Sequence, residues 1–362
     1  MEQCRKILTR YWGFASFRPL QEDIIRSVTE GRDTLALMPT GGGKSITFQV
    51  PALAMEGTCL VITPLIALMK EQVNRLNSLE IRSLMIHSAM TREEIDITIE
   101  NCIYGDYKFL YVSPERISTP LFRNRVGRIN LSLVAVDEAH CISQWGYDFR
   151  PSYLKIAELR SILTEAPFLA VTATATPEVV NDIQEKLHFR NGKVFRMSFA
   201  RDNLVYLVRN VEDKEKYLFK IVDNIPGSGI VYVRNRNKTK EIALMLQRAG
   251  YAADFYHAGL TMEMRNAKQN DWQTGKTRII VATNAFGMGI DKSNVRWVIH
   301  YNLPKNIEGY YQEIGRAGRD GLPSETVLFE SCLLYTSDAA DDLLRVVLGG
   351  RRLIQQKTKT HH

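Results

Sequence analysis

Hydrophobic and polar positions follow two rhythms along the chain, and together they predict buried strands joined by amphipathic helices. The first part of the chain contains short, nearly continuous apolar runs: TLALM (34–38), CLVIT (59–63), RSLMI (82–86), KFLYV (108–112), LSLVAV (131–136) and FLAVT (168–172). Such runs are typical of parallel strands buried on both faces of a sheet. Helical patterns such as PLIALMKEQVNRLNSL and TREEIDITIENCI separate them. Strands that alternate with helices predict βαβ units and a doubly wound sheet.

The same rhythm begins again further along the chain. The second set of apolar runs is GIVYV (229–233), AADFY (252–256), TRIIVAT (277–283) and VRWVIHY (295–301). The intervening stretch 195–208 has no helical period, so we place a domain boundary near residue 205. We therefore expect an α/β protein with two tandem domains, residues 1–205 and 206–330, each a mostly parallel sheet flanked by helices.

Composition and charge add little to this prediction of fold and function. The length of 362 residues fits about two domains, and the net charge of +7 mildly favours a polyanionic partner, although a basic surface is also common in soluble proteins. The five cysteines are widely spaced and form no CxxC pair, which argues against a disulfide framework and against zinc. No apolar stretch reaches membrane-spanning length, so we expect a cytoplasmic protein.

A glycine-rich segment, MPTGGGKS (38–45), ends the first predicted strand and opens a helix. Glycines let successive N–H groups converge on phosphate oxygens, and the helix N-terminus adds positive potential. Lys44 would reach the β- and γ-phosphates, and Ser45 would bind Mg²⁺. Met38 stands where the full phosphate-loop pattern has its first glycine, so a merely flexible loop is the alternative. The nucleotide-binding residues predicted from this segment are Thr40, Gly41, Gly42, Gly43, Lys44 and Ser45.

Two adjacent carboxylates, Asp137 and Glu138, end another predicted strand in VDEAH (136–140). Asp137 can hold Mg²⁺, and Glu138 can orient or deprotonate an attacking water. The alternative is that both carboxylates cap the following helix. His140 is either a buried core histidine or a polar relay from the nucleotide.

Five segments in a fixed order carry a resemblance to a known family. They are MPTGGGKS, VDEAHCISQWGYDFRP, VTATAT, ATNAFGMGIDK and YYQEIGRAGRDG. Together they resemble the motif series of the RecQ family of superfamily 2 DNA helicases, from about residue 5 to about residue 330. The sharpest element is the aromatic-rich loop HCISQWG-DFRP, which other superfamily 2 helicases lack. Tyr147 stands where the family usually has histidine, and it keeps a ring and a hydrogen-bonding group.

The resemblance implies two RecA-like domains that close on ATP and Mg²⁺. It assigns Arg18 and Gln21, in FRPLQ, to the adenine, because an amide can both donate to and accept from the purine edge and a guanidinium can stack on it. A simple helix-entry segment is the alternative there. In GRAGRDG it assigns Arg319 as the arginine finger and Arg316 as a neighbouring contact, with a solvated basic turn as the alternative. Asp291 either binds the ribose or positions the arginines.

The loop that follows DEAH offers faces to unpaired bases. Trp145, Phe149 and Tyr147 can stack on bases, and Arg150 can pair with a phosphate. Because this loop is continuous with Asp137 and Glu138, base stacking could shift the carboxylates and make ATP hydrolysis depend on DNA. The alternative is that the rings fill the core, against which the polar Gln144 argues.

Other polar residues stand at the ends of predicted strands. Thr63 and Ser113 precede helices and are suited to hold DNA phosphates. Thr172 and Thr174, in VTATAT, are expected to couple the nucleotide to the DNA together with His140 and Gln144, although threonine also simply favours strands.

The resemblance stops after TVLFE. Residues 331–362 match neither the zinc module nor the winged helix of the family, and the single cysteine there, Cys332, cannot build a four-ligand zinc site. We interpret residues 331–362 as a non-family tail on a truncated motor core.

The resemblance as a whole implies an ATP-dependent 3′–5′ DNA helicase motor that translocates on single-stranded DNA and unwinds duplexes in recombination and repair. Its expected partners are single-stranded and partly duplex DNA, with no membrane, and its expected place is the cytoplasm, in association with the bacterial nucleoid. Three alternatives remain: an RNA-dependent ATPase of the same superfamily, a single-stranded-DNA-stimulated ATPase without productive unwinding, and a catalytically idle binding module made by truncation. The intact set of Lys44, Asp137, Glu138 and Arg319 argues against the last. Backbone contacts alone do not separate DNA from RNA.

Overall fold

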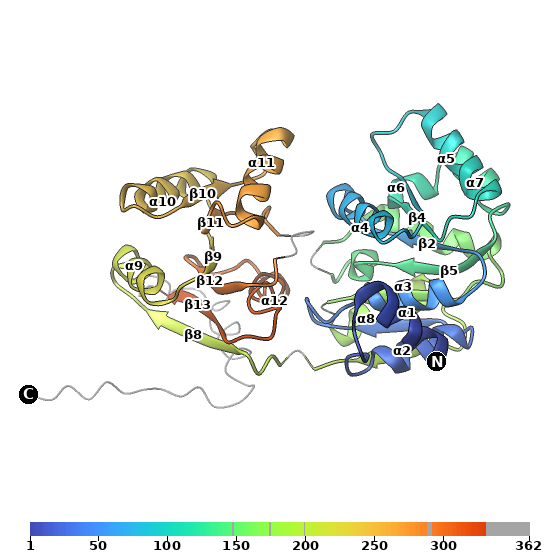
Figure 1. Ribbon diagram of the computed structural model, residues 1–362, viewed down its shortest axis with the longest axis horizontal. Coiled ribbons are helices and arrows are strands. Elements are labelled where there is room, and N and C mark those ends of the chain that lie inside the picture. The colour runs from blue at the N-terminus through green and yellow to red at the C-terminus, as the bar shows by residue number, and fades with distance from the viewer. Residues whose placement is uncertain (147, 174, 199, 288–291, 331–362) are drawn as a thin grey trace, which may run out of the picture. The chain divides into compact units, whose positions relative to one another are not determined.

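The computed structural model describes residues 1–146, 148–173, 175–198, 200–287 and 292–330 (Figure 1). The predictions made for Tyr147, Thr174, Asp291 and the tail 331–362 lie outside these residues. Contacts between residues divide the chain into two compact units. Unit 1 consists of Met1–Asn203, Ala285–Ser293 and Tyr311–Leu322, and unit 2 consists of Leu204–Asn284, Asn294–Tyr310 and the residues from Pro323 onward.

Unit 1 contains a seven-stranded sheet with the order β3-β4-β2-β5-β6-β1-β7, in which every pairing is parallel. The strands are β1 (Thr34–Leu37), β2 (Thr58–Ile62), β3 (Ser83–Ile86), β4 (Phe109–Val112), β5 (Leu131–Val136), β6 (Phe168–Thr172) and β7 (Lys193–Arg196). All except β7 coincide with the predicted apolar runs. Strand β7 was missed because it lies at the sheet edge with its side chains mostly exposed, so it carries no continuous apolar signal.

Helices cover both faces of this sheet, because strand side chains alternate between two cores. Leu35 and Leu37 of β1 pack into one core, and Ala36 packs into the other. The first core is covered by α5 (Arg92–Tyr104), α6 (Pro114–Ile117), α7 (Pro120–Val126), α8 (Pro177–Lys186) and the 3₁₀ helices η1 (Ala139–Ile142) and η2 (Pro151–Ser161). The second is covered by α2 (Gln21–Thr29), α3 (Ile46–Ala54) and α4 (Ile66–Ser78), and α1 (Glu2–Trp12) packs on α3.

A buried ion pair holds the start of β1 in place. Nη2 of Arg160 lies 2.5 Å from Oδ2 of Asp33, and the two side chains are 6% and 3% exposed. Asp33 also accepts hydrogen bonds from the backbone N–H groups of Phe168 and Arg190, at 2.8 and 2.5 Å. One carboxylate therefore fixes β1, β6 and η2 relative to one another.

Unit 2 is built on the same plan. Its six-stranded sheet has the order β10-β11-β9-β12-β13-β8 with every pairing parallel. The strands are β8 (Leu204–Asn210), β9 (Ser228–Tyr232), β10 (Ala253–Tyr256), β11 (Ile279–Ala282), β12 (Val295–His300) and β13 (Ser324–Glu330). Its helices are α9 (Lys214–Asn224), α10 (Arg236–Arg248) and α11 (Met262–Gln273). Helix α12 (Ile307–Ile314) begins in unit 2, and its residues from Tyr311 onward belong to unit 1. The prediction of two parallel-sheet α/β domains flanked by helices is confirmed.

Gly229 in β9 shows how tightly the unit 2 core is packed. A Cβ atom at this position would lie 2.1 Å from the ring of Trp297, which is fully buried on the neighbouring strand β12. Only glycine leaves room for that indole.

In the part of the chain that the structure describes, no helix combines the length and the apolar character needed to cross a bilayer.

Candidate active site

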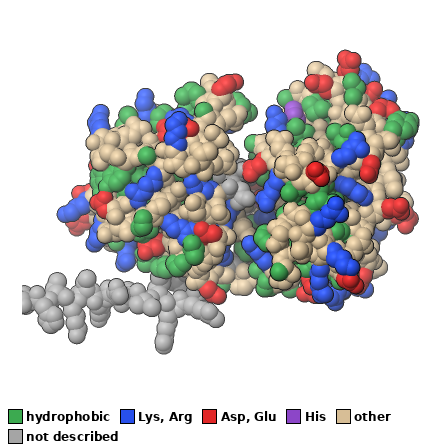
Figure 2. All heavy atoms as spheres, in the orientation of Figure 1, with side chains coloured by type: hydrophobic (Ala, Val, Ile, Leu, Met, Phe, Trp, Pro, Cys, Tyr) green, Lys and Arg blue, Asp and Glu red, His purple; other side chains and the backbone are tan. Residues whose placement is uncertain are grey.

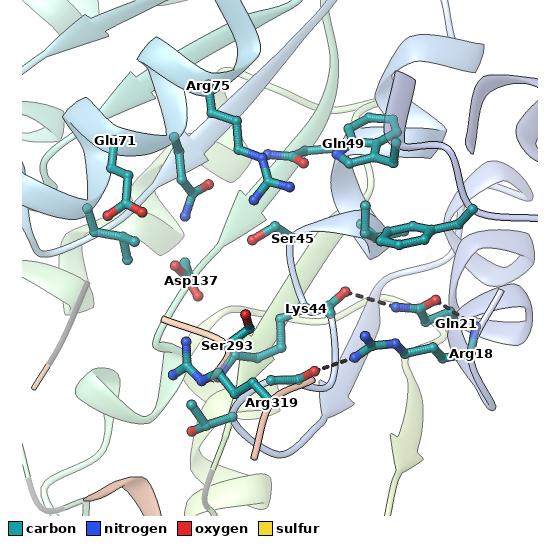
Figure 3. Close-up of a pocket in the computed structure, with 18 of the residues that line it drawn as sticks. Arg18, Gln21, Lys44, Ser45, Gln49, Glu71, Arg75, Asp137, Ser293 and Arg319 are labelled. Carbon is teal, nitrogen blue, oxygen red and sulfur yellow. Dashed lines mark hydrogen bonds between the residues drawn. The ribbon is translucent and has the colours of Figure 1, made fainter. Parts of the chain in front are cut away.

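A cavity of about 530 Å³ lies in unit 1 and opens around the phosphate-loop segment between β1 and α3 (Figure 3). It brings together most of the residues that the sequence predicts for nucleotide binding and hydrolysis. Those that line it are Arg18, Gln21, Thr40, Gly41, Gly43, Lys44, Ser45, Asp137, Glu138, Arg316 and Arg319. Gly42 is not part of the lining, and its N–H donates to the carbonyl of Pro39 instead.

The loop from Thr40 to Ser45 has the geometry of an anion cradle. Gly41 and Gly43 have φ angles of +81° and +80°, in the left-handed region that favours glycine. A Cβ atom on Gly43 would lie 2.4 Å from Nε2 of Gln21. Among the described residues, the N–H groups of Lys44 and Ser45 have no hydrogen-bond acceptor, and they precede the first turn of α3. These donors are therefore available to phosphate oxygens.

Arg18 and Gln21 brace this loop from the side. Nε2 of Gln21 donates to the carbonyls of Gly42 and Gly43 at 3.2 and 3.1 Å, and Oε1 accepts from the Arg18 N–H at 2.9 Å. The guanidinium of Arg18 donates to the carbonyl of Gly41 (Figure 3). Both residues lie in the cavity wall, but their polar groups form hydrogen bonds with the glycine loop and with each other. Their assignment to adenine stays a prediction.

Asp137 follows directly after β5 and is only 6% exposed. Burial raises the pKa of its carboxyl group, the neighbouring Glu138 raises it further, and Lys44 acts in the opposite direction. The Asp137 backbone is fixed at both ends: its N–H donates to the carbonyl of Ile62, and its carbonyl accepts from the buried Tyr153 hydroxyl at 2.9 Å. The carboxylate is therefore held rigidly beside the loop of Lys44.

Glu138 adopts a backbone conformation that a non-glycine residue rarely takes. Its φ and ψ angles are 48° and 46°, in the left-handed region. Its N–H donates to Oδ1 of Asp137 at 2.9 Å. Within the described part of the chain, its Oε2 atom is buried and has no hydrogen-bond partner. Strained backbone and an unsatisfied carboxylate oxygen are typical of functional sites rather than of helix caps.

His140 is buried, with its Nδ1 atom 2.8 Å from the Thr172 hydroxyl and 3.5 Å from Oε2 of Glu138. Burial lowers the pKa of this imidazole below its ordinary value, so it is neutral at pH 7. The side chain thus joins the carboxylate segment to the end of β6. Its role as a relay stays a prediction.

The arginines of GRAGRDG point to an anionic ligand. Arg316 is only 6% exposed, and among the described residues its buried Nε atom has no hydrogen-bond partner. A buried polar atom of a charged group is costly when it has no partner. Arg319 lies against the phosphate loop, since its Cγ atom would be 3.3 Å from a Cβ atom on Gly41. Figure 3 shows Lys44 and Arg319 close together below Ser45 and Asp137. A bound triphosphate would give Nε of Arg316 an acceptor and would lie beside Lys44 and Arg319.

The oxygen donors fit Mg²⁺ bound together with a phosphate. Ser45 and Asp137 line the cavity, and the described residues contain no group of three or more His, Cys, Asp or Glu side chains that could hold a metal alone. Mg²⁺ usually takes one or two protein oxygens and completes its shell with phosphate and water. The expectation of no zinc stays untested, because Cys332 lies outside the described residues.

The sequence analysis missed one wall of the cavity. Helix α4 contributes Glu71, Gln72 and Arg75, and α3 contributes Gln49. The buried Tyr111 hydroxyl accepts from Nε2 of Gln49 at 3.3 Å and donates to Oε1 of Gln72 at 2.9 Å. The i, i+4 spacing of Glu71 and Arg75 on a predicted helix was the available signal. Further lining residues missed by the sequence analysis are Ser293 and Gln312, whereas Trp12 and Phe14 lie in the segment 11–25 that the resemblance assigned to the adenine.

The aromatic loop after η1 exposes its first ring. Trp145 is 75% exposed, which excludes a core role for it. Phe149 is half-buried and Gln144 is exposed. The Arg150 guanidinium donates to Oδ2 of Asp148 at 3.0 and 3.1 Å and to the carbonyl of Pro64 at 3.3 Å. Trp145 is therefore free to stack, while Arg150 is held by the protein.

Thr63 and Ser113 lie at the ends of the neighbouring strands β2 and β4. They are 0% and 2% exposed, and in the described structure neither hydroxyl has a hydrogen-bond partner. Contact of these hydroxyls with DNA stays a prediction. On the face drawn in Figure 2, Lys and Arg side chains are interspersed with Asp and Glu rather than gathered in one basic patch.

Comparisons with known proteins agree with this arrangement. The DEAD/DEAH box helicase family model matches residues 18–183, and the helicase conserved C-terminal domain model matches residues 213–321. The chain is 45% identical to the ATP-dependent DNA helicase RecQ of Bacillus subtilis, over 91% of this chain and 56% of that protein. It is 40% identical to the probable ATP-dependent DNA helicase RecS of the same organism, over 91% of this chain and 67% of that protein.

Solved structures share the fold at low sequence identity. The Mycobacterium smegmatis helicase Lhr bound to single-stranded DNA and AMP-PNP has a TM-score of 0.72 at 22% identity, covering 91% of this chain and 47% of that one. Saccharomyces cerevisiae Dbp5 bound to RNA and ADP BeF₃ has a TM-score of 0.72 at 18% identity, covering 95% and 90%. These likenesses support the fold alone.

Fold, cavity and family models together define a superfamily 2 helicase core of two RecA-like domains. Within that class, the chain belongs to the RecQ family. It spans about half the length of several curated relatives, such as the 51% of RecQ from Pasteurella multocida.

Proposed function

We propose that this chain is an ATP-dependent DNA helicase motor that moves 3′ to 5′ along single-stranded DNA and separates duplexes during recombination and repair. One observation supports it most strongly: Lys44, Asp137, Glu138 and the buried Arg316 line one cavity, and within the described ranges Nε of Arg316 has no hydrogen-bond partner. The names of the relatives, ATP-dependent DNA helicases, support the same activity. The polarity is carried over from the family, as is an association with the bacterial nucleoid.

In the proposed reaction, Lys44 and the N–H groups of the glycine loop hold the β- and γ-phosphates of ATP. Ser45 and Asp137 would hold Mg²⁺, which neutralises phosphate charge when bound. Glu138 orients a water and accepts its proton while the water oxygen attacks the γ-phosphorus. The bond from that phosphorus to the β,γ-bridging oxygen breaks, and ADP and phosphate leave. Arg316 and Arg319 stabilise the negative charge that builds on the phosphoryl oxygens.

Single-stranded DNA is the proposed activator. Bases stack on the exposed Trp145 and on Phe149, since every base offers a π-face. The loop that carries these rings begins immediately after Asp137, Glu138 and His140, so stacking acts on the catalytic carboxylates. Partly duplex DNA is the proposed substrate for strand separation.

The test is phosphate release from Mg·ATP with oligo-dT, with oligo-U and without nucleic acid. The proposal expects strong stimulation by oligo-dT and little by oligo-U, and Lys44→Ala should abolish turnover under all conditions. Equal or greater stimulation by oligo-U would favour an RNA-dependent ATPase instead. Partial duplexes with a 3′ or a 5′ overhang then test polarity, with unwinding expected only from the 3′ overhang. DNA-stimulated turnover without strand separation would limit the function to that of a DNA-dependent ATPase.

A further inference from the structure

The serine that follows η1 ties the aromatic loop to a distant helix. Ser143 is fully buried. Its hydroxyl donates to Oδ2 of Asp182 in α8 at 2.6 Å and accepts the N–H of Trp145 at 3.2 Å. One hydroxyl therefore links the backbone of the exposed tryptophan to a carboxylate on α8.

Asp182 is a strong anchor because it is paired on its other side. Nζ of Lys186 lies 2.7 Å from the same Oδ2 atom. Lys186 and, second, Ser143 hold the pKa of this carboxyl below its usual range, so it is ionised at neutral pH. Hydrogen bonds to an ionised acceptor are stronger than those between neutral groups. The Ser143–Asp182 contact is thus a charge-assisted hydrogen bond between the loop and α8.

Helix α8 connects back to the catalytic segment. It begins shortly after β6, whose last residue, Thr172, bonds His140. Its buried residues Val179 and Ile183 lie in the same core as Cys141 of η1. The segment of Asp137 to His140, the end of β6, α8 and the loop therefore form a closed ring of contacts.

Backbone hydrogen bonds join the residues at the start and the end of this loop. The Arg150 N–H donates to the carbonyl of Cys141 at 2.8 Å, and the Gly146 N–H donates to the carbonyl of Ser143 at 3.0 Å. A Cβ atom on Gly146 would lie 2.5 Å from the carbonyl oxygen of His140. A DNA base that stacks on Trp145 would therefore press on this hydrogen-bonded part of the loop rather than move the loop freely.

We propose that Asp182 is a positioning residue for DNA-dependent turnover, which fixes the Trp145 end of the loop through Ser143. With this anchor in place, the contact of a base with Trp145 is transmitted to the segment of Asp137, Glu138 and His140. Without the Ser143–Asp182 anchor, the loop moves when a base stacks on Trp145, and the contact is not transmitted to the catalytic segment. The inference rests on the proposed function, since it concerns how DNA stimulates the same site.

The experiment measures phosphate release from Mg·ATP against oligo-dT concentration for Asp182→Ala, Ser143→Ala and Asp182→Asn. The matched control is Glu185→Gln, which neutralises an exposed carboxylate on the same helix. Asp182→Ala and Ser143→Ala should each lower the DNA-stimulated rate about tenfold, the equivalent of one charge-assisted hydrogen bond, while DNA-free turnover stays unchanged. Asp182→Asn keeps an acceptor oxygen but loses the charge, so it should restore part of the stimulation. The double variant should be no worse than either single variant, because both remove the same bond.

The outcomes separate the inference from the function. Full stimulation of Asp182→Ala, or an equal loss in DNA-free and stimulated rates, would overturn the inference alone. Absence of DNA stimulation in the unsubstituted chain would overturn the proposed function and the inference with it. Thermal unfolding accompanies each variant, and Ser143→Ala, which removes a single oxygen, carries the test if Asp182→Ala does not fold.

Discussion

The imidazole of His140 lies 2.8 Å from the hydroxyl of Thr172, and both side chains are buried. This contact joins the residue that ends the DEAH segment to the last residue of β6. Because the same imidazole nitrogen is 3.5 Å from Oε2 of Glu138, the position of the carboxylate depends on the end of β6. The geometry makes Thr172 part of the support for Glu138.

Thr172→Val removes this hydroxyl while keeping the branched shape that suits a buried strand. We expect the DNA-stimulated rate to fall about tenfold and the free energy of unfolding to fall by about 1–3 kcal/mol, because a buried imidazole nitrogen loses this hydrogen bond. Phosphate release and urea unfolding measure the two effects. Thr326→Val is the control, since Thr326 is an equally buried strand threonine of unit 2 with its hydroxyl on the Val205 carbonyl. Equal rates for the two variants would contradict a supporting role of Thr172.

Glu138→Gln should separate nucleotide binding from turnover. The amide keeps the size of the side chain but cannot accept the proton of the attacking water, so we expect the rate to fall by roughly 10²–10⁴-fold. Nucleotide affinity should change little, because the glycine loop and Lys44 are untouched. A fluorescent ATP analogue measures binding, and Lys44→Ala, which should lose both properties, is the comparison. Retained turnover in Glu138→Gln would assign the proton acceptor elsewhere.

Asp33→Asn should destabilise unit 1 without altering the cavity directly. The substitution leaves the buried Arg160 guanidinium without its counter-charge, and breaking one partner of such a pair costs about 3–5 kcal/mol. Urea unfolding followed by circular dichroism measures the loss. The exposed pair of Lys6 and Glu2 supplies the control: Glu2→Gln should cost about 0–1 kcal/mol. Similar losses in the two variants would show that burial does not set the strength of the Asp33 pair.

The sequence was sufficient for the parts of the fold that repeat a local pattern. The strands flanked by helices were predicted because their side chains are buried on both faces, as in LSLVAV of β5. Strand β8 was not predicted, since LVYLVRN was assigned to the domain junction, and its burial is only partial. Strand β13 was not predicted either, although most of its side chains are buried. Glycines and adjacent carboxylates were found because their chemistry is encoded within a few positions.

The remaining parts of the site depend on contacts between segments far apart in the chain. The bridge from Gln49 through Tyr111 to Gln72 joins three elements, and none of these residues is unusual in its own segment. The left-handed backbone of Glu138 likewise follows from the packing of η1 and not from a glycine. Burial of Thr63 and Ser113 depends on which segments cover the carboxyl ends of β2 and β4, and no local sequence pattern predicts those segments.

Arg316 provides a test in which activity and stability should change in different ways. Its guanidinium is buried, and among the residues that the structure describes its Nε atom has no hydrogen-bond partner, which is a cost to folding that a bound anion would offset. Arg316→Met keeps most of the aliphatic stem and removes the charge. We expect turnover to fall by about 10³-fold or more, while the free energy of unfolding without nucleotide stays equal or rises. We also expect the shift of the melting temperature produced by Mg·ATP analogues to shrink, because a phosphate contact is lost.

Steady-state phosphate release and thermal unfolding with and without the analogue measure these effects. A variant that unfolds more easily without nucleotide, yet keeps the full shift with the analogue, would show that Arg316 serves the fold and not the phosphates.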